Sequence, residues 1–492
     1  MKYLGISSGF HDAAASVIDD QGKILFAGHS ERYSKKKHDK ELCKSLLGDA
    51  GEVLGSDFQV HYYEKPWLKY LRALRSGERP SISSAFVKNV IGSEGGLQQY
   101  PITTHSHHLC HAAAGFQTSP FTEATVVIID AIGEWDTVTI WDASYDDLGR
   151  AKYKKIWSKR YPDSIGLFYS AMTKRVGLRP LDEEYILMGM AAYGKPRWYT
   201  AIHSELIEDS TSISFTQNLH TGVPDDFLAG ADEMDIAASS QVIVEHLIKN
   251  VMLKARILGR SDNLVYGGGV ALNCLANTGL TKFFSNVWIM PNPGDAGSSL
   301  GAAALGYGRK LQWKTASLGY DIPGAYPVNR LLDVLHTKGI VGVASGRAEF
   351  GPRALGNRSL LADPRGPHIK ERVNEIKRRQ QFRPFAPAIM AEFANSYFDM
   401  PSANLDHRYM QYVCDCREPD LFPAIVHVDG SSRVQTVTKD GSGIRELLEK
   451  WFLLTGCPML LNTSLNIRGE PMVNDLGDAF RFEKLYGVPV IS

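Results

Sequence analysis

The feature that most constrains the fold of this chain is a repeated pattern of an apolar strand, a small polar turn and a second strand. It occurs first at residues 3–18, where His11 and Asp12 lie in the turn, and this segment alone reads as an ordinary hairpin. It recurs at residues 125–141, where an apolar run delivers Asp130 to a glycine-containing turn. Such turns let backbone N–H groups approach a phosphate. Two of them, each opening one half of a domain, predict an internally duplicated ATP-binding scaffold.

Two later segments lead from a strand through a glycine-containing turn into a helix. Residues 263–266 form a strand followed by three glycines at 267–269, and residues 287–290 form a strand followed by a turn with Asp295. Consecutive glycines between a strand and a helix let a ligand lie against bare backbone at a helix N-terminus. The Gly-Lys-Ser/Thr ending of a Walker A motif is missing. The sequence therefore predicts a ligand-binding turn that is not a P-loop.

Four histidines lie within the seven residues from His105 to His111, directly before an alanine run. Alanine favours helix, and on a helix positions i and i+4 share one face. His107 and His111 would then point the same way and could hold one metal ion, with further ligands from elsewhere in the chain. A metalloprotease motif is excluded, because His108 stands where that motif needs glutamate. For this pair alone, a polar, half-exposed helix start is an equally good interpretation.

Composition indicates a globular chain of at least two domains. Its 492 residues exceed one ordinary core, and 44% hydrophobic with 22% charged residues is typical of a globular protein. The longest apolar run, at residues 124–132, is far shorter than the roughly 18 residues of a membrane span, and the start lacks the apolar core of a signal peptide. Six cysteines without framework spacing suit reduced thiols, and the absence of Cys-x-x-Cys excludes a zinc ribbon. We therefore expect a cytoplasmic protein with no membrane partner.

A loop rich in glycine and arginine follows the strand predicted at residues 340–344. It contains Arg347, Arg353 and Arg358, and further basic residues follow at 377–383. The guanidinium fork grips phosphate with two hydrogen bonds, so this loop predicts a site for an anionic substrate. Over the whole chain, 54 basic residues balance 54 acidic ones, which neither favours nor excludes nucleic acid as a partner.

A series of motifs along nearly the whole chain resembles the O-carbamoyltransferase family that includes the Nod-factor and tobramycin carbamoyltransferases and the carbamoylating part of the hydrogenase maturation factor. Each motif alone is weak, but their order is specific. The motifs are G-F-H-D-A-A-A-S at 9–16, H-H-x-x-H-A-A-A at 107–114, D-E-E-Y-x-x-M-G-M-A-A-Y-G-K-P at 182–196, G-G-V-A-L-N at 268–273, P-G-D-A-G at 293–297, G-R-x-E-F-G-P-R-A-L-G-N-R-S at 346–359, F-R-P-F-A-P at 382–387, H-V-D-G at 427–430, R-V-Q-T-V at 433–437 and L-N-T-S-x-N-x-R-G-E-P at 461–471. Family members usually carry one acidic residue where this chain has Glu183 and Glu184.

The resemblance implies an α/β fold of two domains. A duplicated actin-like ATPase (ribonuclease H-like) domain is expected at residues 1–320, and a smaller α+β domain that binds carbamoyl phosphate at residues 321–492. The boundary lies within residues 313–328, which show little periodicity. By analogy, carbamoyl phosphate loses its phosphate, the carbamate reacts with ATP to give carbamoyladenylate and pyrophosphate, and an acceptor hydroxyl then displaces AMP.

The resemblance also assigns residue roles. The base for the acceptor hydroxyl would be His11, and the catalytic candidates beside it are Asp12 and Lys36. The nucleotide would be bound by Asp130, Gly133, Gly268, Gly269 and Asn273. Carbamoyl phosphate would be bound by Arg433, Arg468 and a basic residue at Lys377 or Arg378. Further candidates for binding the substrate are Arg347, Arg353, Arg358 and Asn462. A divalent metal, Fe²⁺ with Mg²⁺ or Mn²⁺ as alternatives, would be held against the nucleotide phosphates by His107, His111 and Asp295.

The acceptor and the partners stay open at this point. The acceptor is a hydroxyl on a secondary-metabolite sugar or lipo-oligosaccharide, or on 5-hydroxymethylcytosine in DNA, and residues 196–260 are expected to shape its pocket. DNA and a second copy of the chain remain candidate partners. One alternative is a tRNA threonylcarbamoyladenosine synthase-like transferase, which the arginine-rich C-terminal half disfavours. The other is a non-enzymatic actin-like nucleotide switch, which would leave Arg433 and Arg468 without a role.

Overall fold

The chain folds into two compact units, called unit 1 and unit 2 below. The computed structural model describes residues 1–92, 94–366, 368–401, 405–439, 441 and 443–492. Unit 1 comprises Met1–Leu25 and Lys40–Trp313, and unit 2 comprises Phe26–Asp39 and Lys314–Ser492. The segment 26–39 therefore groups with the C-terminal part of the chain. Within the described residues, no helix is both long enough and apolar enough to cross a membrane.

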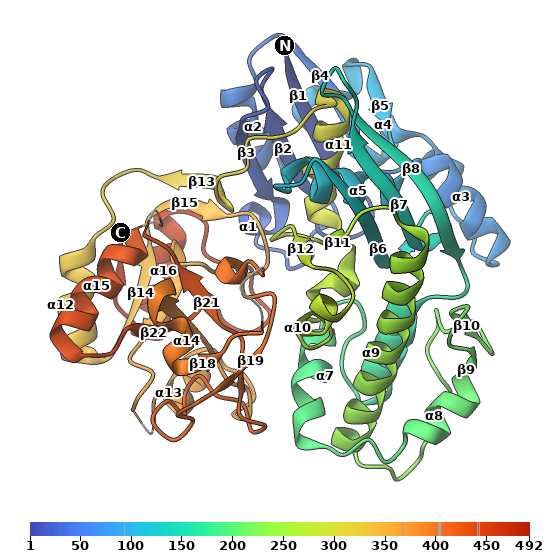
Figure 1. The fold of residues 1–492 in the computed structure, drawn as a ribbon. Helices are drawn as coiled ribbons and strands as arrows, with labels where there is room; N and C mark the ends of the chain where they lie inside the picture. The colour runs from blue at the N-terminus through green and yellow to red at the C-terminus, as the bar shows by residue number, and fades with distance from the viewer. Residues whose placement is uncertain (93, 367, 402–404, 440, 442) are drawn as a thin grey trace. The chain divides into compact units, whose positions relative to one another are not determined.

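Unit 1 is built on two five-stranded sheets (Figure 1). The first has the order β3-β2-β1-β4-β5, and the second, read from its other edge, has the order β8-β7-β6-β11-β12. The strands of the first sheet are β1 (Lys2–Ser7), β2 (Ala14–Ile18), β3 (Ile24–His29), which continues into unit 2 from Phe26, β4 (Phe58–Tyr62) and β5 (Ile102–Thr104). Those of the second are β6 (Glu123–Gly133), β7 (Asp136–Tyr145), β8 (Ala151–Arg160), β11 (Asn263–Gly267) and β12 (Asn286–Ile289).

The two sheets share one topology. In each, the first strand of the repeat is central, pairs antiparallel with the second strand and parallel with the fourth. The fifth strand pairs parallel with the fourth in both. The order within each repeat is thus 3-2-1-4-5, and the duplicated scaffold expected from the two hairpins is confirmed.

Helices of unit 1 connect and cover these strands. They are α2 (Lys44–Leu54), α3 (Pro66–Arg75), α4 (Val87–Ile91), α5 (His107–Thr118), α6 (Ile165–Arg175), α7 (Glu184–Met190), α8 (Tyr199–Leu206), α9 (Glu233–Leu258), α10 (Cys274–Thr278) and α11 (Ser298–Tyr307). A short hairpin, β9 (Ile207–Asp209) with β10 (Ser214–Phe215), follows α8.

Small residues let α5 and α11 pack very closely against each other and against β1. A Cβ atom on Gly301 would lie 1.9 Å from the carbonyl oxygen of Cys110, and one on Gly5 would lie 1.9 Å from that of Ser299. The alanines at 112–114 and 302–304 are buried. The alanine and glycine runs of the sequence therefore serve close backbone packing.

Unit 2 is organised around a six-stranded sheet of order β21-β17-β22-β16-β14-β23. Its strands are β14 (Ile340–Ala344), β16 (Arg358–Ala362), β17 (Ala386–Met390), β21 (Gln435–Val437), β22 (Met459–Ser464) and β23 (Val490–Ile491). The other strands of the unit are β13 (Ser317–Ile322), β15 (Gly346–Glu349), β18 (Phe398–Asp399), β19 (Cys414–Cys416) and β20 (Ser431–Ser432). Its helices are α1 (Ser30–Ser34), α12 (Val328–Lys338), α13 (Ile369–Ile376), α14 (Ala394–Tyr397), α15 (Gly443–Thr455) and α16 (Leu476–Tyr486).

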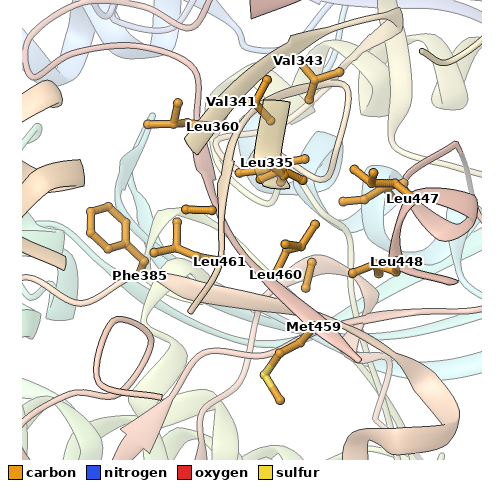
Figure 2. Packing of buried hydrophobic residues seen from close by; sticks show 14 of the residues in the cluster. Leu335, Val341, Val343, Leu360, Phe385, Leu447, Leu448, Met459, Leu460 and Leu461 are labelled. Carbon is orange, nitrogen blue, oxygen red and sulfur yellow. The ribbon is translucent and has the colours of Figure 1, made fainter. Parts of the chain in front are cut away.

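The core of unit 2 lies where α12 and α15 pack on the central strands (Figure 2). Leu335 of α12 and Leu447 of α15 meet Val341 and Leu460, and all four side chains are at most 1% exposed. Burying side chains of this size stabilises the fold by about 1.5–3 kcal/mol each. This unit therefore has its own hydrophobic core, as expected of a domain.

The basic cluster at 152–160 forms β8 at the edge of the second sheet. Lysines are common on edge strands, where their charge discourages pairing with another chain.

Candidate functional site

Four buried side chains of unit 1 converge on one point. His107 and His111 come from α5, Asp130 from β6, and Asp295 from the turn before α11. The Nε2 atoms of the two histidines are 3.0 Å apart. Nε2 of His107 lies 3.0 Å from Oδ2 of Asp130 and 3.3 Å from Oδ1 of Asp295. Nε2 of His111 lies 3.6 Å and 3.3 Å from the same two oxygens.

These separations fit a metal ion. With metal–ligand bonds of about 2.1 Å, donor atoms lie about 3.0 Å apart at 90° and about 3.4 Å apart at 109°. The measured spacings run from 3.0 to 3.6 Å. Two imidazoles and two carboxylates are a donor set for a divalent transition metal. The cluster therefore has the composition and spacing of a metal site, and Asp130, predicted from sequence to bind the nucleotide, belongs to it.

Close packing brings the four donors together. α11 packs tightly on α5, so the turn that carries Asp295 reaches the face of α5 with the two histidines. Asp130 is oriented from its other side, where its Oδ1 accepts the backbone N–H of Gly269 at 3.1 Å. Gly268 makes this approach possible: its φ is +88°, and a Cβ there would lie 2.2 Å from the carbonyl oxygen of Ile129.

The histidines and carboxylates of the cluster strongly shift one another's pKa. Burial lowers the pKa of His107, but Asp295 and Asp130 outweigh it and raise that pKa well above its ordinary value. Burial also lowers the pKa of His111, and the same two carboxylates raise it overall. Burial raises the pKa of both carboxyl groups, yet the histidines lower each below its usual range. Both carboxylates are therefore anionic, which favours a cation between them.

The predicted base, His11, lies beside this cluster. Its Nδ1 is 2.9 Å from Oδ2 of Asp12, and its Nε2 is 3.7 Å from Oδ2 of Asp295. Burial lowers the pKa of His11, but Asp295 and Asp12 outweigh burial and raise it. The structure thus brings His11 and Asp12 to the edge of the metal cluster. Lys36 is an exposed residue of unit 2.

The residues predicted to bind nucleotide surround Asp130. Gly133 sits against the histidines, since a Cβ there would lie 2.4 Å from the His108 ring and 2.5 Å from the His107 ring. Asn273 is buried and exchanges hydrogen bonds of 3.1 Å with Gln241. Its side chain also caps α10 by accepting the N–H of Ala276 at 3.2 Å. These contacts order the turn; nucleotide binding itself stays a prediction.

In unit 2, two of the predicted arginines hold backbone in place. The guanidinium of Arg358 is fully buried and donates to the carbonyl oxygens of Asn474, Ser345, Gly346, Asn357 and Tyr320 at 3.0–3.1 Å. Arg347 donates to the carbonyls of Leu318 and Gly319 at 2.6 and 3.3 Å. These geometries favour a structural role for both, and their binding of substrate stays a prediction.

Other predicted basic residues form a group around β22. The ammonium of Lys377 is buried and donates to Ser464 and to the side chain and carbonyl of Asn466. Burial lowers the pKa of Lys377 well below its usual value, and the neighbouring Arg379 and Arg383 lower it further.

The remaining predicted substrate residues differ in exposure. The backbone N–H of Arg468 donates to the carbonyl of Lys377 at 2.9 Å, and its side chain is exposed. Nε of Arg433 is buried with no hydrogen-bond acceptor among the described residues. Asn462 donates to Gln435 and to the carbonyl of Ala354. Arg353 is half-buried in the loop before β16. The structure therefore links Lys377 and Arg468 directly.

Sequence reasoning missed two acidic residues near the metal cluster. Oε2 of Glu64 lies 4.0 Å from Nδ1 of His107, and Glu134 accepts the backbone N–H of Lys65 at 2.7 Å. Both follow the end of a buried strand, β4 and β6. Asp130 is predicted from sequence because it is an acidic residue at the end of an apolar strand. Glu64 meets the same criterion and could have been predicted in the same way.

The sequence matches two family models in order along the chain. The model described as "Carbamoyltransferase N-terminus" matches residues 84–304, and that described as "Carbamoyltransferase C-terminus" matches residues 332–491. Nodulation protein NolNO of Sinorhizobium fredii is 30% identical over 95% of this chain and 76% of that protein. Nodulation protein NolO of Bradyrhizobium diazoefficiens is 30% identical over 76% of this chain and 75% of that protein.

Two other proteins, one compared by sequence and one by structure, are also similar to this chain. An uncharacterized protein of Synechocystis is 33% identical over 97% of this chain and 93% of its own length. Among solved structures, component A of the (R)-2-hydroxyglutaryl-CoA dehydratase of Acidaminococcus fermentans covers 62% of this chain and 98% of that chain, with 15% identity and a TM-score of 0.33. That structural likeness is too weak to bear on this protein. The two family models and the nodulation proteins establish that the chain belongs to the carbamoyltransferase family and is a carbamoyltransferase.

Proposed function

We propose that this carbamoyltransferase is an ATP-dependent O-carbamoyltransferase that works through carbamoyladenylate. The observation that carries the proposal is the buried cluster of His107, His111, Asp130 and Asp295 in the duplicated scaffold of unit 1. This donor set suits Fe²⁺ or another divalent ion of similar preference, such as Mn²⁺. When bound, such an ion would neutralise charge on the nucleotide phosphates. The turn at Gly268 and Gly269, which contacts Asp130 through the N–H of Gly269, would receive the nucleotide.

His11 is the residue that would accept the proton of the acceptor hydroxyl. Asp12 engages its Nδ1, which leaves Nε2 on the side of Asp295. In the transfer step, the acceptor oxygen bonds to the carbamoyl carbon and the bond from that carbon to AMP breaks. AMP leaves with the bonding electrons, and His11 receives the proton. A positioned general base of this kind typically contributes about 10²–10⁴-fold to a rate.

The basic group of unit 2 would bind carbamoyl phosphate and release its phosphate. Lys377 is buried between polar oxygens, with Arg379 and Arg383 adding positive potential. The buried Nε of Arg433 has a hydrogen to donate. An anionic donor would offset this charge, and the same cations would stabilise the departing phosphate. Water supplies the oxygen that converts the carbamoyl group to carbamate, which then attacks the α-phosphorus of ATP and displaces pyrophosphate.

Product analysis tests the proposal. With ATP, carbamoyl phosphate and a hydroxyl acceptor, we expect AMP and pyrophosphate in equal amounts, measured by ion-exchange chromatography. Formation of ADP instead would rule out the carbamoyladenylate route.

Arg433→Ala should raise the KM for carbamoyl phosphate at least about tenfold and leave the KM for ATP unchanged, because a lost charged hydrogen bond costs about 1.5–3 kcal/mol. Arg330→Ala, at an exposed arginine of α12, is the matched control.

A further inference from the structure

Unit 1 contains a cavity to which the steps above give no role. It has a volume of about 1000 Å³ and lies between α3, the turn joining β6 to β7, and the end of β8. Its lining includes Lys65, Arg72, Arg75, Trp135 and Tyr161. A volume of this size is that of a site for a substantial organic molecule.

The cavity adjoins the metal cluster through a second, smaller one. That smaller cavity, of about 240 Å³, is lined by His107 and Asp295 and by Phe10, the neighbour of His11. Arg72 and Glu134 line both cavities. A molecule in the larger cavity could therefore extend a hydroxyl toward the cluster where the carbamoyl group would be transferred.

Charge in the larger cavity is unbalanced. Five cationic side chains and two acidic ones line it, the acids being Glu134 and Asp136. Asp136 is already paired with Lys155 at 2.8 Å and Arg160 at 3.4 Å. Glu134 accepts the backbone N–H of Lys65 at 2.7 Å. The cavity therefore carries an excess of positive charge.

Three of the cations have no counter-ion in the part of the chain that the structure describes. Lys65, Arg72 and Arg75 form no ion pair with a carboxylate among those residues. Arg72 is only 8% exposed, and its guanidinium lies 5.8 Å from the ring centre of Tyr161. Burial lowers the pKa of Arg72, and Glu78 and Glu64 offset only part of this effect. An anionic ligand would supply a counter-ion.

The two aromatic side chains add a surface for a ring. Trp135 and Tyr161 line the cavity, and Arg75 lies 5.8 Å from the ring centre of Trp135. Flat aromatic rings beside guanidinium groups bind sugars and heterocycles by stacking and cation–π contact. This combination of charge and rings defines the kind of molecule that the cavity would accept.

We propose that this cavity is the acceptor site, and that the acceptor is a small anionic molecule that carries a hydroxyl, a sugar or heterocyclic ring, and a phosphate or carboxylate group. The proposal rests on the proposed function and narrows its substrate class, because a polycationic acceptor such as an aminoglycoside would be repelled. Of residues 196–260, which are expected to shape the acceptor pocket, Asn218 lines the larger cavity and His220 lines the smaller one.

Isothermal titration of the full-length protein tests the anion preference, with carbamoyl phosphate and a non-hydrolysable ATP analogue at saturation to occupy their own sites. Glucose 1-phosphate should bind at least tenfold more tightly than glucose, and uridine diphosphate glucose more tightly again. Tobramycin should give no binding heat. Equal affinities for glucose and glucose 1-phosphate, or binding of tobramycin, would overturn the proposal.

Variants locate the binding. Arg72→Gln and Arg75→Gln should each weaken binding of glucose 1-phosphate about tenfold or more, since a charged hydrogen bond contributes about 1.5–3 kcal/mol. Arg75 is exposed, so its replacement leaves the fold intact even where loss of the buried Arg72 disturbs it. Arg260→Gln, at an exposed arginine of unit 1 outside the cavity, should leave the affinity unchanged. Unchanged affinity in Arg75→Gln as well would show that the anion binds elsewhere.

A separate measurement distinguishes this proposal from the function on which it rests. Exchange of labelled pyrophosphate into ATP by the wild-type protein, with carbamoyl phosphate and no acceptor, reports on carbamoyladenylate formation alone. Absence of exchange would refute the proposed function. Exchange without any preference for anionic probes would refute only the acceptor assignment.

Discussion

At the residue scale, the centre of unit 1 is a cluster of two imidazole rings and two carboxylates. The measured distances between their donor atoms run from 3.0 to 3.6 Å. His107 and His111 are four positions apart in a helix, which places them on one face of α5 with their Nε2 atoms 3.0 Å apart. The sequence predicted this pair from its spacing. Direct contact with Asp130 depends on the turn at Gly268, which no local pattern specifies.

Replacing a donor should abolish metal binding. We expect His111→Ala to weaken Mn²⁺ binding at least about 100-fold, because even residues that only support metal ligands contribute about 10–100-fold to affinity. Isothermal titration of Mn²⁺ into metal-free protein measures this effect. His203→Ala, in α8, should bind Mn²⁺ like the wild type. Equal Mn²⁺ affinity in His111→Ala would remove the cluster from the mechanism.

A second histidine pair should make unit 1 sensitive to acid. Nδ1 of His61 lies 3.1 Å from Nε2 of His105, and burial lowers the pKa of each ring to about 4. Above pH 6.5 the rings are neutral in both folded and unfolded chains. Between pH 6.5 and about 4 the unfolded chain binds protons that the folded chain does not, so stability falls as the pH falls.

Urea unfolding at a series of pH values measures this loss, which should reach roughly 1–3 kcal/mol. His61→Gln should make the free energy of unfolding less dependent on pH across this window, whatever its effect at pH 7.5. His336→Gln, at an exposed side chain of α12, is the control. A pH dependence identical in wild type and His61→Gln would contradict the assignment.

At the scale of elements, the repeat of strand, turn and strand predicted the duplication because period and polarity are local properties of the sequence. Strand β8 was not predicted from the sequence, because its lysines obscure the alternation of apolar and polar residues that is typical of a strand. The alanine and glycine content of α5 and α11 predicted helix, but the partner of each helix became clear only in three dimensions.

Close approach of α5 and α11 gives a prediction for Gly301. A Cβ at this position would lie 1.9 Å from the carbonyl oxygen of Cys110, so Gly301→Ala must push the helices apart. We expect a loss of about 1–3 kcal/mol in the free energy of unfolding, together with weaker Mn²⁺ binding. Thermal unfolding and metal titration measure the two effects.

Gly48→Ala, in helix α2, is the matched control because its Cβ would meet nothing within 4 Å. It should be neutral or stabilise the protein by up to about 1 kcal/mol, since alanine is the better helix former. Wild-type stability in Gly301→Ala would show that the helix packing is looser than described.

At the scale of the whole molecule, the chain forms two units, and each contains its own group of buried charged side chains. Unit 1 holds the histidine and carboxylate cluster, and unit 2 holds the basic group around Lys377. Segment 26–39 joins unit 2, although it follows the first hairpin of unit 1 directly in sequence. The amino-acid composition does not change at segment 26–39, so the sequence alone assigns this segment to the domain expected at residues 1–320.

Metal binding should stabilise the folded protein. At a free Mn²⁺ concentration of 100 times its Kd, the free energy of unfolding should rise by about 2.7 kcal/mol, because the ion binds the assembled cluster and not the unfolded chain. Urea unfolding with Mn²⁺ or with a chelator measures the difference. His107→Ala should show none, and an equal gain in that variant would locate the ion elsewhere.

The sequence by itself determined the α/β class, the duplicated scaffold and the family, because these depend on periodicity and on motifs whose order is visible along the chain. It also marked His107, His111 and Asp295 as candidates for one metal site and Asp130 as a candidate for binding nucleotide. Only the tertiary structure decided that the donor atoms of these four lie within 4.8 Å of one another, that the guanidinium of Arg358 binds backbone carbonyls, and that a cavity of about 1000 Å³ opens beside Arg72. Those facts depend on packing between distant segments, which local sequence patterns do not record.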